Sequence, residues 1–243
     1  MKYPAYPVYR KTGISFLDRL PADWSARRLR FITAGIEQGW SPQCDNDIAA
    51  DDGWGVMKVG CVNGHQFDPL ENKALPADLE PLPEYELHPG DVLISRANTR
   101  DLVGSAAVVP HDVRPKLLLC DKLFRLSPDP QIDERYLTYF LRTPAARYQY
   151  EKNATGASGS MQNIGQDTIK NLVLPIPPRA EQQNIATFLD WKTSQIDTLI
   201  TKKQALSHGL AGLEFLVEYR TALITAAVTG QIDVRGVDVP QMA

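Results

Sequence analysis

The sequence predicts an α+β fold, in which a globular domain of short strands and a few helices is followed by one long coiled-coil α-helix. The first observation is a series of short apolar runs separated by turn residues from residue 24 to 178, which is typical of strands. The second is a stretch without proline from 181 to about 227, directly after the prolines of 174–178. These changes predict a globular domain at 1–178, a spacer and dimerisation helix at 179–229 and a C-terminal tail at 230–243.

The globular domain should combine several strands with two helices. The segment 133–141 places Tyr136, Leu137 and Phe140 at helical spacing, and the segment 144–150 begins with a proline, which a first helical turn accepts. The remaining apolar runs are too short for helices. We expect strands at 55–62, 91–95, 105–109, 116–119, 123–126 and 172–176.

The C-terminal helix carries a heptad pattern. Nine of the twelve positions reached by alternate steps of four and three from Ile185 are apolar, and the other three are Lys192, Lys203 and Arg220. A pattern of this length keeps one narrow apolar face on a partner helix. We therefore expect a dimer seam made of Ile185, Leu189, Ile196, Leu199, Leu206, Leu210, Leu213, Val217 and Ile224.

The predicted length of this helix suggests that it projects from the domain. A continuous helix over 185–224 would be about 60 Å long at a rise of 1.5 Å per residue. Such a helix needs a mate, which a second copy of the chain could supply. The alternative is a long helix packed on its own domain. Gly230 is a typical signal for the end of the helix.

The composition is that of an ordinary globular protein of 243 residues, with 43% hydrophobic and 23% charged residues. No apolar stretch is long enough for a membrane span, and no apolar segment follows the basic residues near the N-terminus, so we expect a cytoplasmic protein without a membrane partner. The three cysteines are widely spaced and predict reduced thiols instead of a disulfide framework or a metal site.

The net charge of −3 argues against a protein that is basic throughout, as many nucleic-acid-binding proteins are. The charge is nevertheless uneven along the chain. Residues 37–91 hold twelve acidic residues against two lysines, whereas 92–170 hold eleven basic residues against eight acidic ones. This distribution is compatible with one DNA-facing edge and one acidic flank, although it also occurs in proteins that never bind DNA.

Motifs of catalysis are missing from the sequence. It contains no phosphate-binding glycine loop, no dinucleotide fingerprint, no zinc-protease motif and no serine-hydrolase elbow, and its four histidines lie in unrelated contexts. We therefore expect no catalytic residue, no metal and no cofactor bound by this chain. Two other readings stay open: an enzyme with an unrecognised site, and a coiled-coil adaptor that binds protein and not DNA.

Two polar segments could read the edges of bases. In the first, 96–100, arginine can bond guanine and asparagine can bond adenine, each through two hydrogen bonds. The second, 153–163, holds glycines and short hydroxyl and amide side chains; on composition alone it could equally be a surface loop. The candidate DNA-binding residues are Arg96, Asn98, Thr99, Arg100, Lys122, Ser158, Ser160, Gln162 and Asn163.

Several segments together resemble the specificity subunit of type I restriction–modification systems. The resemblance covers almost the whole chain, and the motifs stand in the order of the family. It departs from the family pattern at Phe16, Asp18 and Asp23, where tryptophan, glycine and histidine are usual. The matching segments are GISFL and LPADW at 13–24, PGDVLIS at 89–95, GSMQNI at 159–164, LVLPIPPRAEQQNIA at 172–186 and AVTGQIDVRG at 227–236.

The resemblance implies a recognition subunit for double-stranded DNA. Members of the family normally carry two recognition domains and two helical spacers, whereas this chain has one of each, which implies a half-subunit that pairs with its own copy through the helix. It also implies that two methyltransferase subunits dock on the helices and supply S-adenosylmethionine. It leaves open whether a restriction subunit joins them. Two heads on antiparallel helices should read an inverted, two-part target whose gap the helix sets.

Overall fold

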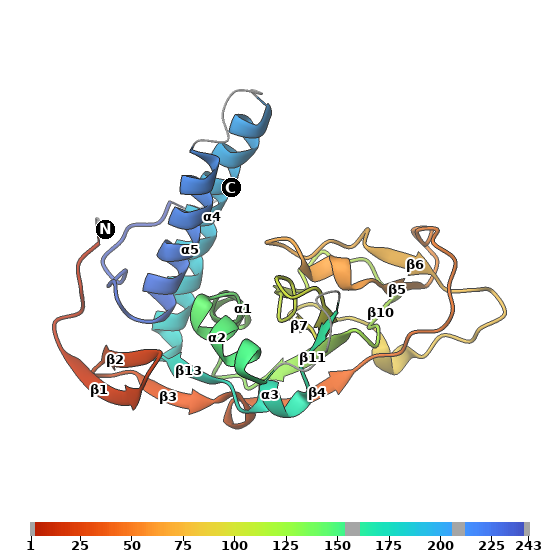
Figure 1. Ribbon diagram of the computed structural model, residues 1–243. Coiled ribbons are helices and arrows are strands. Elements are labelled where there is room, and N and C mark those ends of the chain that lie inside the picture. Colours follow the sequence, from red (N-terminus) through yellow and green to blue (C-terminus); the bar gives the residue numbers. More distant parts are fainter. Residues whose placement is uncertain (1–2, 154–160, 206–211, 241–243) are drawn as a thin grey trace. The chain divides into compact units, whose positions relative to one another are not determined.

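The computed structural model describes residues 3–153, 161–205 and 212–240, and these form two compact units (Figure 1). The first unit consists of Met1–Arg27, Arg135–Ala146 and Val173–Ala243. The second consists of Arg28–Glu134 and Arg147–Leu172. The chain therefore passes between the units several times.

An antiparallel sheet of four strands forms the centre of the second unit. The strand order is β4-β11-β7-β9, with β4 at Thr33–Gln38, β11 at Leu123–Pro128, β7 at Val92–Ser95 and β9 at Ala106–Val108. Every residue of β7 is buried, which explains why this strand has a continuous apolar run and not an alternating pattern.

A second sheet packs its apolar residues into the same unit. It has the order β10-β5-β6, with β10 at Leu117–Leu118, β5 at Gly55–Met57 and β6 at Asn72–Ala74. Side chains from both sheets, such as Val56, Leu93 and Leu118, share one hydrophobic core. The 3₁₀ helices η1 and η3 lie at Leu29–Phe31 and Pro83–Tyr85, and η2, at Val59–Val62, contributes Cys61 to this core.

The cysteines are free thiols, as expected from their spacing. Burial is the main cause that raises the pKa of Cys61 well above its usual value and that of Cys120 to about 11. Both side chains pack in the core of the second unit. Thiols that are buried and protonated are unreactive, so these two have a structural role.

The first unit combines two small sheets with three helices. Strands β1, at Tyr9–Ile14, and β2, at Leu17–Pro21, form an antiparallel hairpin, while β3, at Ser25–Arg28, pairs with β13, at Val173–Ile176. Helix α1, at Glu134–Leu141, is bonded to β13 and to the last residue of the C-terminal helix. The hydroxyl of Tyr136 lies within hydrogen-bonding distance of both the Pro175 and the Val228 carbonyl oxygens.

The C-terminal helical region is a hairpin of two helices. Helix α4 spans Arg179–Ala205, helix α5 spans Leu213–Val228, and Figure 1 shows α5 running back along α4. The α+β class with a long C-terminal helix is confirmed, but the expected continuous helix over 185–224 is corrected to a longer and a shorter one. Gly212 explains why α5 begins as a separate helix. Its φ of +111° is a left-handed backbone conformation, which does not continue a right-handed helix.

The division into two helices changes what the heptad positions contact. Four of the predicted seam residues, namely Ile185, Leu189, Ile196 and Ile224, are buried within the chain itself, so the reading in which the helix packs on its own domain holds for this part. Leu199 and Val217 remain 52% and 48% exposed, and Leu213 is half-buried. Leu206 and Leu210 lie outside the described residues.

The C-terminal tail folds back on the first unit. The predicted end of the helix at Gly230 is confirmed, because α5 ends at Val228 and Gly230 adopts a φ of +70°. Ile232 and Val234 are buried, and the Asp233 amide donates to the Pro4 carbonyl oxygen at 2.7 Å. The tail is therefore part of the packed unit.

Most of the expected elements of the globular domain are present. The run at 55–62 proves to be a short strand followed by η2. Of the other five predicted strands, four are one or two residues shorter than expected, and β11 extends two residues beyond the predicted 123–126. Helix α1 confirms the first predicted helix, and α2, at Pro144–Asn153, confirms the second. Sequence reasoning missed the three strands before residue 30, β4, β6, the short strands β8 and β12 and the helix α3, at Gln166–Lys170.

Candidate nucleic-acid interface

The two polar segments singled out from the sequence pair with each other in the second unit. Strand β8, at Ala97–Asn98, runs antiparallel to β12, at Gln162–Asn163, and Gln162 lies opposite Asn98 in the register. The Ile164 amide extends the pairing by donating to the Arg96 carbonyl oxygen at 2.9 Å. Segments more than sixty residues apart in the sequence thus form one ribbon, which we call the β8–β12 ribbon (residues 96–100 and 161–164).

Arg96 anchors this ribbon. Its Nη1 donates to the Asp121 carbonyl oxygen at 3.1 Å, its backbone amide donates to the Lys122 carbonyl oxygen at 2.9 Å, and its guanidinium lies 5.8 Å from the centre of the Phe124 ring. Its Nε is buried and has no hydrogen-bond partner among the described residues. These contacts hold the ribbon against the segment that contains Lys122. They also leave few N–H groups of the Arg96 guanidinium accessible for hydrogen bonds to a base.

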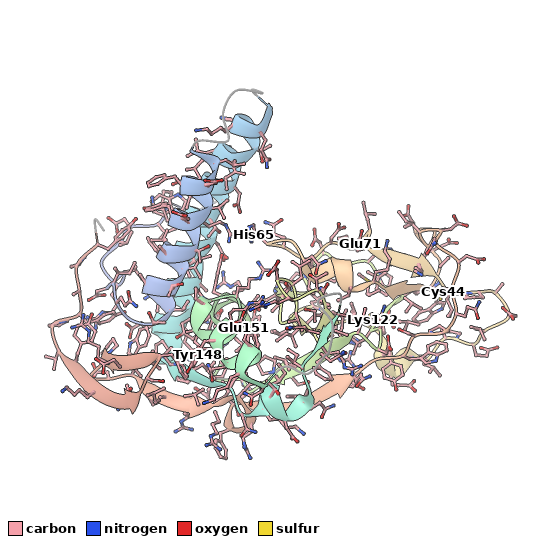
Figure 2. The ribbon with its side chains drawn as sticks, in the orientation of Figure 1. Cys44, His65, Glu71, Lys122, Tyr148 and Glu151 are labelled. Atoms are coloured by element: carbon pink, nitrogen blue, oxygen red, sulfur yellow. The ribbon has the colours of Figure 1, made fainter. Side chains whose placement is uncertain are left out.

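Asn98 is a structural residue, which corrects its place among the base-reading candidates. Its side chain is only 7% exposed; Nδ2 donates to Oδ1 of Asn63 at 2.8 Å, and Oδ1 accepts the Thr99 amide at 2.9 Å. Both ends of the amide are therefore used inside the protein. The contact also places the exposed polar segment 63–66, which contains His65 (Figure 2), beside the ribbon.

The exposed part of the first polar segment is Thr99 and Arg100. Its loop is closed by the Val103 amide, which donates to the Thr99 carbonyl oxygen at 2.9 Å. Arg147 on α2, which sequence reasoning missed, donates from its two terminal nitrogens to the carbonyl oxygens of Arg100 and Asp101, at 2.9 and 2.7 Å. The backbone under Arg100 is thus fixed while its side chain faces solvent.

The remaining candidates divide between exposed and undescribed positions. Gln162 and Asn163 are half-buried, and Lys122 is exposed (Figure 2). Ser158 and Ser160 lie outside the described residues. Acidic neighbours accompany the cations, because Asp101 follows Arg100 directly and Asp121 precedes Lys122. The ribbon and these neighbours therefore form a polar surface of mixed charge, which is suited to reading hydrogen-bonding patterns.

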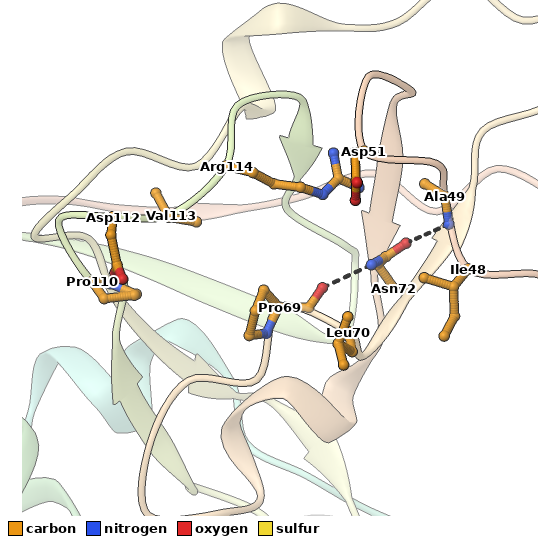
Figure 3. Close-up of a pocket in the computed structure, with 10 residues that line it drawn as sticks. All are labelled: Ile48, Ala49, Asp51, Pro69, Leu70, Asn72, Pro110, Asp112, Val113 and Arg114. Carbon is orange, nitrogen blue, oxygen red and sulfur yellow. Dashed lines mark hydrogen bonds between the residues drawn. The ribbon is translucent and has the colours of Figure 1, made fainter.

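A small cavity in the same unit offers no catalytic arrangement. It has a volume of about 270 Å³ and lies beside β6, where the Asn72 side chain bridges the Ala49 amide and the Pro69 carbonyl oxygen (Figure 3). Its polar lining is Asp51, Asn72, Asp112 and Arg114, without a nucleophile and base in contact. In the part of the chain that the structure describes, no group of three or more His, Cys, Asp or Glu side chains is placed to hold a metal ion.

Comparison with known families decides the assignment. Residues 62–208 match the model of the type I restriction modification DNA specificity domain. The chain belongs to this family. The matched region contains both strands of the β8–β12 ribbon and Lys122, together with all of α4.

Individual relatives of this specificity-domain family agree. The chain is 31% identical over 190 residues to the type I restriction enzyme EcoEI specificity subunit of Escherichia coli, an alignment that covers 76% of this chain and 32% of the relative. It is 26% identical over 209 residues to the putative type I restriction enzyme MjaX specificity subunit of Methanocaldococcus jannaschii, covering 84% of this chain and 47% of that subunit. The chain thus spans about a third of the first of these relatives and about half of the second.

Solved structures show the same fold. The crystal structure of the HsdS subunit from Thermoanaerobacter tengcongensis superimposes with a TM-score of 0.54 at 24% identity, covering 93% of this chain and 49% of that subunit. A chain from a study of complex assembly and conformational transition in a type I restriction–modification system gives a TM-score of 0.56 at 22% identity, covering 92% of this chain and 49% of that one. No described helix is both long and apolar enough to cross a membrane.

Proposed function

We propose that the chain is a sequence-specific DNA recognition subunit of a type I restriction–modification complex and performs no chemistry itself. The observation that carries the proposal is the β8–β12 ribbon, which brings two polar segments from distant parts of a specificity domain to one exposed surface. Its exposed side chains can donate and accept hydrogen bonds in the patterns that base edges offer.

The contacts of these residues suggest separate roles in recognition. Arg100 has an anchored backbone and a free-standing guanidinium, which suits two hydrogen bonds to guanine. The amides of Gln162 and Asn163 suit adenine, and the ammonium group of Lys122 suits a phosphate. Arg96 and Asn98 hold the ribbon in place and position these side chains.

The reaction itself belongs to partner subunits in this proposal. Methyltransferase subunits supply S-adenosylmethionine and the catalytic groups for adenine methylation, since the sequence lacks the corresponding motifs. A restriction subunit would join the same assembly if the system also cleaves DNA. This chain contributes double-stranded DNA recognition and the surface on which the partners assemble.

We also propose that two copies of the chain pair through the α4–α5 hairpin. Apolar side chains remain exposed on both helices near Gly212, namely Leu199, Phe215, Val217 and Tyr219. Several large apolar side chains exposed on one hairpin favour burial against a partner. Two recognition domains joined in this way would read a two-part target with an inverted arrangement.

Co-expression with a cognate methyltransferase subunit tests the function. We expect the two proteins to co-purify and the methylome of the cells to contain one two-part motif with methylated adenines. The Arg100→Ala variant should retain the complex and relax one base of the motif. A coiled-coil adaptor, the alternative function, predicts instead that the purified chain shows no salt-dependent binding to duplex DNA.

A further inference from the structure

A second cationic cluster lies on the second unit, outside the β8–β12 ribbon. Arg28 and Arg30 flank the buried Leu29, and Figure 1 shows α3 beside the segment that leads into β4. Nη1 of Arg28 donates to Oδ1 of Asn171 at 3.4 Å, and Nη2 of Arg30 donates to the same oxygen. Two guanidinium groups therefore converge on one neutral acceptor.

The scaffold under this cluster is well defined. Nδ2 of Asn171 donates to the Asp167 carbonyl oxygen at 2.8 Å, which orients the amide oxygen toward the two arginines. The Leu29 amide donates to the Leu172 carbonyl oxygen at 2.8 Å, which ties the arginine segment to the residue after Asn171. The convergence thus follows from backbone contacts on both sides.

The charges of the two arginines are not neutralised within the protein. Both side chains are exposed, and neither forms a salt bridge with any carboxylate in the described ranges. Two positive charges held close together repel each other, and the dipole of one amide offsets only part of this repulsion. An anion placed between them would remove the repulsion and use the many N–H donors that have no acceptor.

Phe31, the residue after Arg30, indicates which class of anion the cluster would bind. Phe31 is 67% exposed, and the Arg30 guanidinium lies 5.9 Å from the centre of its ring. An exposed aromatic ring beside an arginine suits a polymer that presents phosphates beside apolar sugar and base surfaces better than it suits a small hydrated ion. The chemistry is that of a nucleic-acid backbone.

We infer that Arg28, Arg30 and Asn171 form a phosphate clasp for the DNA backbone, separate from the residues that read bases. This inference rests on the proposed DNA-binding function and adds a contact that is independent of sequence. Each arginine would neutralise a phosphate, and the clasp would fix how the duplex lies across the domain while the ribbon selects the bases.

The salt dependence of DNA binding by the full chain tests the clasp. The affinity for a 30-base-pair duplex of arbitrary sequence would be measured by fluorescence anisotropy over a series of NaCl concentrations. Replacing both arginines by alanine should reduce the slope of log K against log [NaCl] by about 1.8, because each lost phosphate contact removes about 0.9. The loss should be the same for duplexes of unrelated sequence.

A second variant keeps the arginines and blocks the site. Asn171→Asp places a carboxylate where the two guanidinium groups converge, so it should lower the affinity and the slope. The substitution also removes the bond from Nδ2 to the Asp167 carbonyl oxygen, so the thermal midpoint is measured to check that the variant is folded. The matched control is Lys202→Ala with Lys203→Ala, which removes two charges from the end of α4 and should leave the slope unchanged.

The outcomes separate this inference from the proposed function. Wild-type protein that binds with a steep salt dependence, together with unchanged slopes in both the double arginine variant and Asn171→Asp, would overturn the clasp alone. Wild-type protein without salt-dependent binding to any duplex would overturn the DNA-binding function and the clasp together.

Discussion

Nε of Arg220 on α5 donates to Oδ1 of Asp197 on α4 at 2.9 Å, and this ion pair fixes how the two helices of the hairpin face each other. The Arg220 side chain is almost completely buried, whereas that of Asp197 is partly exposed. Arg142 lies in the same charged group, and burial together with the nearby Arg220 lowers its pKa to about 10. Asp197 is therefore the carboxylate that offsets two buried or partly buried guanidinium groups.

The ion pair leads to a prediction for the stability of the hairpin. Asp197→Ala should lower the free energy of unfolding by about 1–3 kcal/mol, because it leaves the buried Arg220 charge without its partner; the partial exposure of Asp197 keeps the loss below that of a fully buried pair. Urea denaturation followed by circular dichroism measures the change. The double variant Asp197→Ala/Arg220→Met should recover part of the loss, since it removes the unpaired charge as well. Equal stability of the wild type and the single variant would contradict this account.

The β8–β12 ribbon predicts different consequences for two neighbouring residues. Arg100→Ala should cost about 1–3 kcal/mol of discrimination at one base, with little change in stability, because its exposed side chain has no structural task. Asn98→Ala should instead lower the free energy of unfolding by about 1–3 kcal/mol, because it removes the bond to Asn63 and leaves buried polar groups unsatisfied. Binding assays on a panel of single-base variants of the target and thermal unfolding distinguish the two. The assignment is wrong if Asn98→Ala relaxes one base and stays as stable as the wild type.

The exposed apolar residues of the hairpin predict self-association. Replacing both Leu199 and Val217 by glutamate should convert a dimer to a monomer, because the charges would be buried against the second copy. Sedimentation velocity measures the mass, and the thermal midpoint serves as a control, since neither residue is buried within the chain. An unchanged sedimentation coefficient of a dimeric wild type would show that the copies pair elsewhere.

Buried tyrosines predict a loss of stability in alkaline solution. Desolvation is the main cause that raises the pKa values of Tyr136, Tyr139 and Tyr150 above that of a free phenol. A raised acid pKa stabilises the fold fully below the unfolded value of about 10, and this contribution is lost as the pH rises from there toward the folded value. The free energy of unfolding should thus fall above about pH 10, and the absorbance that comes from ionisation of these buried phenols should appear together with unfolding.

A tyrosine variant provides the control for this pH dependence. Tyr150→Phe removes one such proton, so the slope of stability against pH above about pH 10 should decrease by up to about 1.4 kcal/mol per pH unit. Arg142 acts in the opposite direction, because its lowered pKa adds stability as it loses its proton above about pH 10. Its single contribution cannot offset several tyrosines. An unaltered slope in Tyr150→Phe would show that this phenol ionises before unfolding.

The sequence by itself determined the local elements and the family. Apolar runs bounded by turn residues predicted strands such as β7 and β11, and helical spacing predicted α1, because these patterns depend on near neighbours in the chain. The motif order, from the segment before Trp24 to that around Gly230, indicated a specificity subunit, and the match over 62–208 confirms it. Arg100, a base-reading candidate because of its residue type, is exposed in the structure, and its role in recognition stays a prediction.

Only the tertiary structure decided which of these residues face one another. Asn98 looked like a base reader until its amide was found bonded to Asn63, and Arg147 gave no signal because its acceptors are backbone carbonyls more than forty residues away. The heptad pattern likewise predicts that a helix has an apolar face, but it does not indicate which partner covers that face. Two helices of one chain satisfy Ile185 and Ile224 as well as a second copy would, since apolar burial depends on the area removed from water and not on the origin of the neighbour.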